Sequence, residues 1–125
     1  MENDIRILRL VTGEDIICNF NKISVDDYVV SDPMTLIIKF SGKNSNVIME
    51  HWLPVEVIHK NSVLIESKQV LTMFDPNEDL AEYYTGLVEK LHDTIRQRRM
   101  VEEMELDGMI ELIEAVEESK SKTIH

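Results

Sequence analysis

The residue preference of the chain changes abruptly near Asp75-Pro76, and this change constrains the fold more than any other feature. Residues 1–75 are rich in Ile, Val, Thr and Phe, whereas residues 76–125 are rich in Glu, Leu, Met and Ala. β-Branched and aromatic residues favour strands, and unbranched residues favour helices. A chain of 125 residues suits one domain, or one domain plus an appended helix. We therefore expect a strand-forming domain over residues 1–75, followed by a helical extension.

Short runs of apolar residues, several of them alternating with polar ones, predict five or six antiparallel strands in the first part. Gly13 is able to take the positive φ that the first hairpin turn demands. Pro33 and Pro54 lack a backbone donor, so we expect each to interrupt an extended run. So many strands in about 75 residues predict a small, highly curved barrel. The expected extended segments are 5–11, 16–20, 28–30, 34–40, 47–53, 55–58, 63–65 and 70–74.

The second part opens with a helix-start signal. Asp75 is expected as the N-cap, with Pro76 at the first helical position and Glu78 at the third. Apolar residues then recur at helical spacing from Leu80 to Ile95, and again from 101 to 116. We expect the helical extension to cover 76–118, with a weak point at 107–108 where Gly108 lowers helix propensity, and a frayed tail over 119–125.

Charge is distributed unevenly along the chain. The formal net charge is −11, and residues 102–118 hold eight acidic residues and no basic one, just after Arg96, Arg98 and Arg99. This balance argues against a broad phosphate-binding surface, without excluding a small local one. The acidic stretch has two interpretations: a solvated helix face whose apolar seam binds another copy, or a mimic of nucleic acid. We favour the first, because charged helix faces are common.

Motifs that carry catalysis or bind metals are absent from the sequence. The lone Cys18 lies in a strand pattern and is expected to be a buried thiol; the four histidines lack metal-ligand spacing, and there is no phosphate-binding glycine motif. We expect no enzymatic activity, no metal and no cofactor. No apolar stretch is long enough for a membrane helix, and the acidic start of the chain does not resemble a secretory signal. We therefore expect a cytoplasmic protein with no membrane association.

Two motifs of the first part resemble those of the Sm/LSm/Hfq family. The glycine turn at Gly13 is followed at three, seven and ten residues by Ile16, Phe20 and Ile23. Residues 62–73 are similar to the second motif, two strands joined by a very short turn. The segments 52–54, 70–72 and 75–78 add a closer similarity to the Sm-like proteins of marine cyanophage origin. Such an origin would place the protein in the cytoplasm of an infected host cell.

The resemblance implies a strongly bent, five-stranded antiparallel barrel that assembles into a homo-oligomeric ring. Strand 70–74 would pair with segment 63–65 of a neighbouring copy, and the helix would help to close the ring. The side chains expected at the interface between copies are Val63, Ile65, Val70, Met73, Tyr83, Tyr84 and Leu87.

The family also implies binding of single-stranded RNA or DNA, but this chain departs from its pattern. Ser24 and Tyr28 replace residues that grip a base, and Glu66-Ser67 stand where Sm proteins have Arg-Gly. Tyr28 remains able to stack on a base, although packing on the barrel is favoured. The candidate nucleic-acid residues are Tyr28, Lys68, Lys22 and Lys43. The first expectation is RNA binding in RNA processing or regulation; the alternative is a structural ring that docks a protein partner through its helices.

Overall fold

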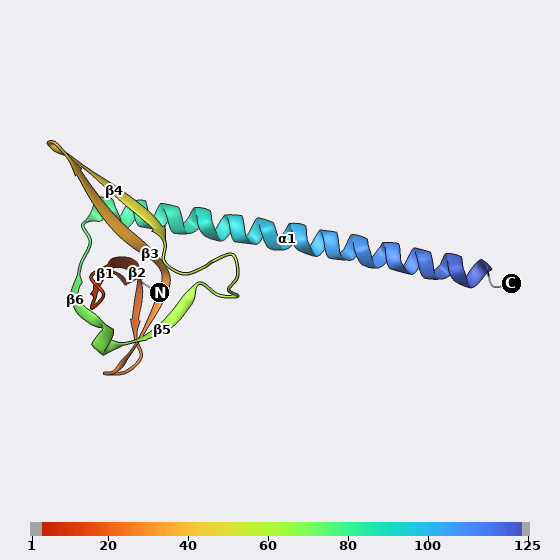
Figure 1. Ribbon diagram of the computed structural model, residues 1–125, viewed down its shortest axis with the longest axis horizontal. Coiled ribbons are helices and arrows are strands. Elements are labelled where there is room, and N and C mark those ends of the chain that lie inside the picture. The colour runs from red at the N-terminus through yellow and green to blue at the C-terminus, as the bar shows by residue number, and fades with distance from the viewer. Residues whose placement is uncertain (1–3, 124–125) are drawn as a thin grey trace. The chain divides into compact units, whose positions relative to one another are not determined.

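The protein is mainly β, with one long helix after the strands (Figure 1). The computed structural model describes the backbone of residues 4–123 and the side chains of residues 4–114. The chain divides into two compact units, Met1–Gly86 and Leu87–His125, which are described separately. The elements are β1 (Ile5–Leu10), β2 (Asp15–Lys22), β3 (Asp27–Ser41), β4 (Asn44–His51), β5 (Ser62–Glu66), the 3-10 helix η1 (Ser67–Gln69), β6 (Val70–Phe74) and α1 (Glu78–Thr123).

All strand pairs are antiparallel, in the order β4-β3-β2-β1-β6, and β5 also pairs with β3. The sheet therefore has six strands, not five, and it is not a closed barrel: in the described part of the chain, β5 and β6 are not paired with each other. The sixth strand arises because β4 and β5, which both pair with β3, are separated in the chain by residues 52–61, which form no strand. The predicted strand 55–58 is wrong, since Val57 N donates to Pro54 O at 3.0 Å and closes a turn there.

A bend inside β3 explains why Pro33 does not end the strand. Ser31 pairs with Asn19 and Met34 with Ile17, so Asp32 and Pro33 together oppose one residue of β2. Asp32 has a φ of 50°, an uncommon value for a residue other than glycine. β3 changes partner at this bulge, from β5 before it to β4 after it. A proline without a donor is tolerated at such a bulge.

The core of the first unit lies between the curved strands. A cluster of buried side chains forms its centre, and half-buried apolar side chains, among them Phe20 and Trp52, pack against this cluster. Cys18 belongs to the cluster, as predicted, and burial raises the pKa of its thiol to about 12, with a smaller contribution from the charge of Asp4. Ile17 is also fully buried, so β2 is covered on both faces. The buried cluster is Leu8, Leu10, Ile16, Cys18 and Val30.

The helix begins two residues later than the sequence predicts. Leu80 N donates to Asn77 Oδ1 at 2.8 Å, which makes Asn77 the N-cap. Asp75 instead forms an ion pair with Arg6 at 3.0 Å. α1 continues without interruption through Gly108, because one glycine costs only about 1 kcal/mol among good helix formers. Of the predicted frayed tail, the backbone is helical to Thr123, and residues 124–125 lie outside the described residues.

The first turns of α1 are anchored to the sheet by Tyr84. Its side chain is only 1% exposed. The hydroxyl donates to Asp32 O at 2.7 Å and lies 3.4 Å from Ser31 O, so it serves the carbonyls at the bend of β3. Burial is the main cause that raises the pKa of this phenol. Tyr84 therefore links the bulge in β3 to the first turns of the helix through a hydrogen bond between residues that are 52 positions apart in the chain.

Candidate functional site

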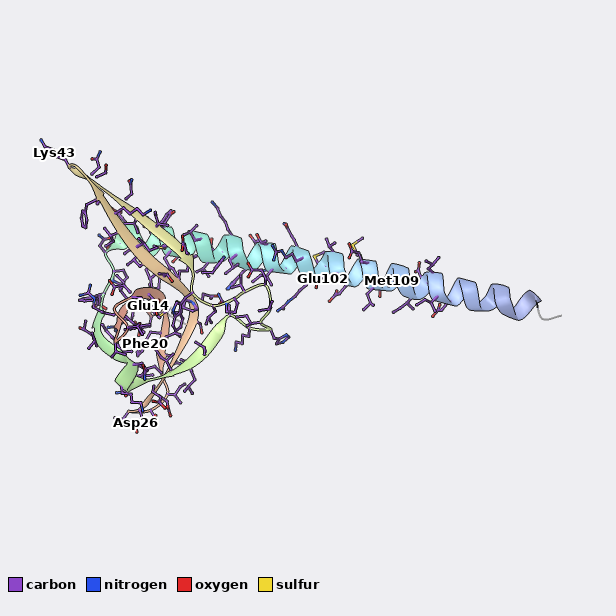
Figure 2. The ribbon with its side chains drawn as sticks, in the orientation of Figure 1. Glu14, Phe20, Asp26, Lys43, Glu102 and Met109 are labelled. Atoms are coloured by element: carbon purple, nitrogen blue, oxygen red, sulfur yellow. The ribbon has the colours of Figure 1, made fainter. Side chains whose placement is uncertain are left out.

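The loop before β3 and the short helix η1 meet at one end of the sheet. Asp27 pairs with Glu66 across β3 and β5, and Ser67 N donates to Asp26 O at 2.7 Å. Together they surround a cavity of about 290 Å³, lined by Asp26, Asp27, Glu66, Ser67 and Lys68. Figure 2 labels Asp26 at this end of the sheet. The location is where the family resemblance expects the base-binding residues.

The loop is shaped by hydrogen bonds to one serine. Ser24 Oγ accepts from the backbone N of Asp27 at 3.1 Å and of Asp26 at 3.3 Å. Such local bonds are typical of Ser in turns and fix the loop without a ligand. The backbone therefore bends at residues 24–26, directly before β3 begins.

The charges that line this cavity disfavour the binding of a phosphate group. Three carboxylates line it against a single ammonium group, that of Lys68. Lys68 Nζ lies 2.9 Å from Glu66 Oε2, and this hydrogen bond with its charge attraction raises the pKa of Lys68. The lysine stays protonated, but its charge is already balanced by a neighbour. A phosphate at this point would meet the net negative charge of Asp26 and Asp27.

Tyr28 packs on the sheet in the way that the sequence favours. Its ring meets that of Phe20 edge-to-face, with centroids 4.9 Å apart and an interplanar angle of 67°. Such a contact stabilises the pair by about 1 kcal/mol beyond burial. Phe20 in turn packs against the buried cluster. Stacking of a base on Tyr28 is therefore restricted to the part of the ring that remains exposed.

The structure brings three of the four candidate nucleic-acid residues to the same end of the sheet. Lys22 pairs with Tyr28 across β2 and β3, and Lys68 follows directly after β5. Lys43 does not join them, because it lies at the tip of the β3–β4 hairpin, at the other end of this unit from Asp26 (Figure 2).

The seven residues expected between copies fall into three groups. Val63, Ile65, Val70 and Met73 are half-buried and pack against the core of their own chain. Tyr84 is buried as described above, so its side chain has no surface to offer to a neighbour. The remaining two also belong to α1: Tyr83 is exposed, and Leu87 is half-buried at the start of the second unit.

Sequence reasoning missed the apolar side chains on the outer face of the same strands. Leu64 is 55% exposed and Leu71 is 64% exposed. The signal was available, since side chains alternate along a strand and the neighbours of an inward residue point outward. The outward apolar positions of β5 and β6 are therefore better candidates for contact with another copy.

Metal binding has no candidate site among the residues whose side chains are described. No group of three or more His, Cys, Asp and Glu side chains in residues 4–114 is arranged to hold a metal ion. Over its described length, α1 has no stretch that is long and apolar enough to cross a membrane.

Comparison with known proteins places the chain in a family. It matches none of the curated proteins with which it was compared. Residues 3–89 match the model of a family of unknown function, DUF6561. This match covers well over half of the chain, including all six strands and the start of α1. The protein is therefore a member of the DUF6561 family.

Proposed function

We propose that the protein is a homo-oligomeric assembly module, whose copies join through the free edges of β5 and β6 into an Sm-like ring. The observation that carries this proposal is the pair of open edges in one small sheet. Among the described residues, β5 pairs only with β3, and β6 only with β1. An open edge presents unpaired backbone donors and acceptors, which another strand satisfies.

Neither edge carries the usual protection against pairing. Proteins that keep an edge free place charges or proline on it. β6 (Val70–Phe74) has no charged residue and no proline, and β5 (Ser62–Glu66) has a charge only at its last position. The edge strand β4 differs, because it begins with Asn44-Ser45-Asn46 and contains Glu50.

Pairing between β5 of one copy and β6 of the next would remove both edges at once. It would also bring Leu64 and Leu71, the outward apolar residues of the two strands, to the same face of the joined sheet. Because the two edges are different surfaces, the contact repeats head-to-tail and produces a ring when the rotation closes.

The strand order supports the finer comparison with the Sm fold. β4 and β5 both pair with β3, one after the other, along the edge that β2 does not occupy. When they are counted as one strand interrupted by residues 52–61, the sheet has five strands in the order that an Sm-like barrel requires.

Charge substitutions on the outer face of the edge strands test the assembly. L64K/L71K places two lysines against each other at the proposed contact, and we expect a smaller mass in light scattering than that of the wild type. L64K/L71E should restore the assembly, since opposite charges across strands attract. V57K changes an exposed apolar residue in the turn after β4 and serves as the control. A wild-type mass equal to one chain at micromolar concentration would refute the module.

A second candidate function is binding of single-stranded nucleic acid. It is favoured by one observation, the gathering of Lys22, Tyr28 and Lys68 at one end of the sheet. Against it stand the acidic cavity and the ion pair of Lys68 with Glu66. A fluorescence anisotropy titration with mixed-sequence RNA at two salt concentrations decides the matter. Salt-sensitive binding that Y28A/K68A weakens would support this candidate, and no binding at low salt would remove it.

A further inference from the structure

The distal part of α1 exposes more large apolar side chains than a solvated helix needs. Eight of them are between 45% and 71% exposed, within fourteen residues. Isolated apolar residues on a surface are ordinary, but such a density marks a surface that contacts another molecule. The eight are Met100, Val101, Met104, Leu106, Met109, Ile110, Leu112 and Ile113.

One stripe of side chains runs along this part of the helix. Steps of three or four residues connect its members, so all of them lie on one face of the helix. Apolar residues occupy both ends of the stripe, and charged residues occupy its middle. In chain order the members are Leu91, Ile95, Arg98, Glu102, Leu106, Met109 and Ile113.

The positions of this stripe are symmetric about Glu102. Its other members lie 4, 7 and 11 residues before and after that residue, as their numbers show. A second identical helix, running in the opposite direction about a two-fold axis at Glu102, would therefore place stripe positions opposite stripe positions along the whole length, with Glu102 opposite Glu102 and Arg98 opposite Leu106. Apolar ends would face apolar ends: Leu91 would meet Ile113, and Ile95 would meet Met109.

Charge selects this direction over the parallel one. In a parallel pair in register, Arg98 faces Arg98, Arg99 faces Arg99 and Glu105 faces Glu105, so like charges lie together. In the antiparallel pair, Arg99 lies at the level of Glu105 and Arg98 at the level of Leu106, so Glu102 opposite Glu102 at the axis is the one like-charge contact left on the stripe. Both copies contribute the same contacts, as a two-fold interface requires.

We propose that α1 is a second self-association element, which pairs antiparallel with α1 of another copy about a two-fold axis at Glu102. The pairing covers the apolar residues of the stripe and leaves fewer like charges facing each other than a parallel pair in register. It does not depend on the proposed pairing of β5 with β6, because it uses residues 91–113 alone. In this pair, the acidic segment 102–114 of one copy lies beside the arginines at 98 and 99 of the other copy.

Charge variants test the direction of pairing. R98E/R99E places acids against acids in the antiparallel pair, and we expect self-association to weaken at least about tenfold. R98E/R99E/E102R/E105R exchanges the two signs within one chain, so it should restore the association. In a parallel pair, neither variant would have this effect, since identical charges face each other in every case. Equal association of the wild type and R98E/R99E would overturn the proposal.

A distance measurement in the full-length protein gives a separate readout. A spin label is attached to E114C, while the buried Cys18 remains unlabelled. In the antiparallel pair, the two labels are separated by 24 residues of helix, about 36 Å along the axis at 1.5 Å per residue. A parallel pair would hold them at about the interhelical distance of 10 Å.

The same measurement distinguishes this proposal from the ring. The distance of about 36 Å should persist in the L64K/L71K variant, where edge pairing is weakened, and should disappear in R98E/R99E. A peak that survives R98E/R99E and is lost in L64K/L71K would assign it to the sheet and refute helix pairing. Far-UV circular dichroism of each variant confirms that the helix is retained.

Discussion

Removing one hydroxyl group at Tyr84 tests how the helix is fastened to the sheet. The hydroxyl donates to Asp32 O at 2.7 Å, at the bend of β3 where φ is 50°. Y84F keeps the ring and its packing but leaves that half-buried carbonyl without this donor. The loss of a partner for a buried polar group costs about 1–3 kcal/mol. Y84A also removes the ring, and truncation of a buried aromatic costs about 3–5 kcal/mol.

The assay is urea unfolding followed by the fluorescence of Trp52, the one tryptophan of the chain, which packs against the core. All variants are compared at one protein concentration, because self-association changes apparent stability. For a domain of this size, each 1 kcal/mol corresponds to a fall in Tm of about 4–8 °C.

Y83F is the matched control, because it removes the same hydroxyl group from the adjacent residue, Tyr83, whose side chain is 53% exposed. Its free energy of unfolding should stay within about 0.5 kcal/mol of the wild type. If Y84F also falls within that range while the protein remains folded, the hydrogen bond at the bend contributes nothing and the reasoning is wrong.

Two further predictions concern the backbone and the buried thiol. G13A should destabilise the protein by more than about 1 kcal/mol, because Gly13 has a φ of 93°. G86A should stabilise it by about 0.5–1 kcal/mol, because Gly86 lies in the helix and a Cβ there would meet no other atom within 4 Å. Thermal unfolding of both variants checks these values. Burial raises the pKa of Cys18 from 9.0 to about 12, so the folded state keeps its proton when the unfolded chain loses it. Stability should therefore fall as the pH rises from about 9 towards 12, and the fall in C18A should be shallower; equal slopes in chemical denaturation would contradict the assignment.

Local patterns in the sequence were sufficient for most of the elements. Short apolar runs predicted β1 and β6, alternation of side chains predicted β2, and the change of residue preference near Asp75 predicted the helix. The buried position of Cys18 also followed from its place in a strand. These features depend on neighbours within a few residues, which is the range that such patterns cover.

The failures share a cause in tertiary structure. Pro33 lies inside β3 because a bulge and a change of partner strand accommodate it, which the residues around it do not indicate. Asp75 does not cap the helix, since its carboxylate forms an ion pair with Arg6 of β1, a strand that is distant in sequence. The positions of the candidate nucleic-acid residues also depend on tertiary structure: Lys22, Tyr28 and Lys68 converge through strand pairing, and Lys43 lies at the tip of the long β3–β4 hairpin.

Self-association through the sheet edges is the central claim, and the mass of the particle in solution tests it most directly. One chain has a mass of 14.5 kDa. Light scattering of the full-length protein at micromolar concentration should give a stable multiple of that mass, lower in L64K/L71K and recovered in L64K/L71E. A wild-type mass of one chain, or a multiple that L64K/L71K leaves unchanged, would contradict assembly through β5 and β6.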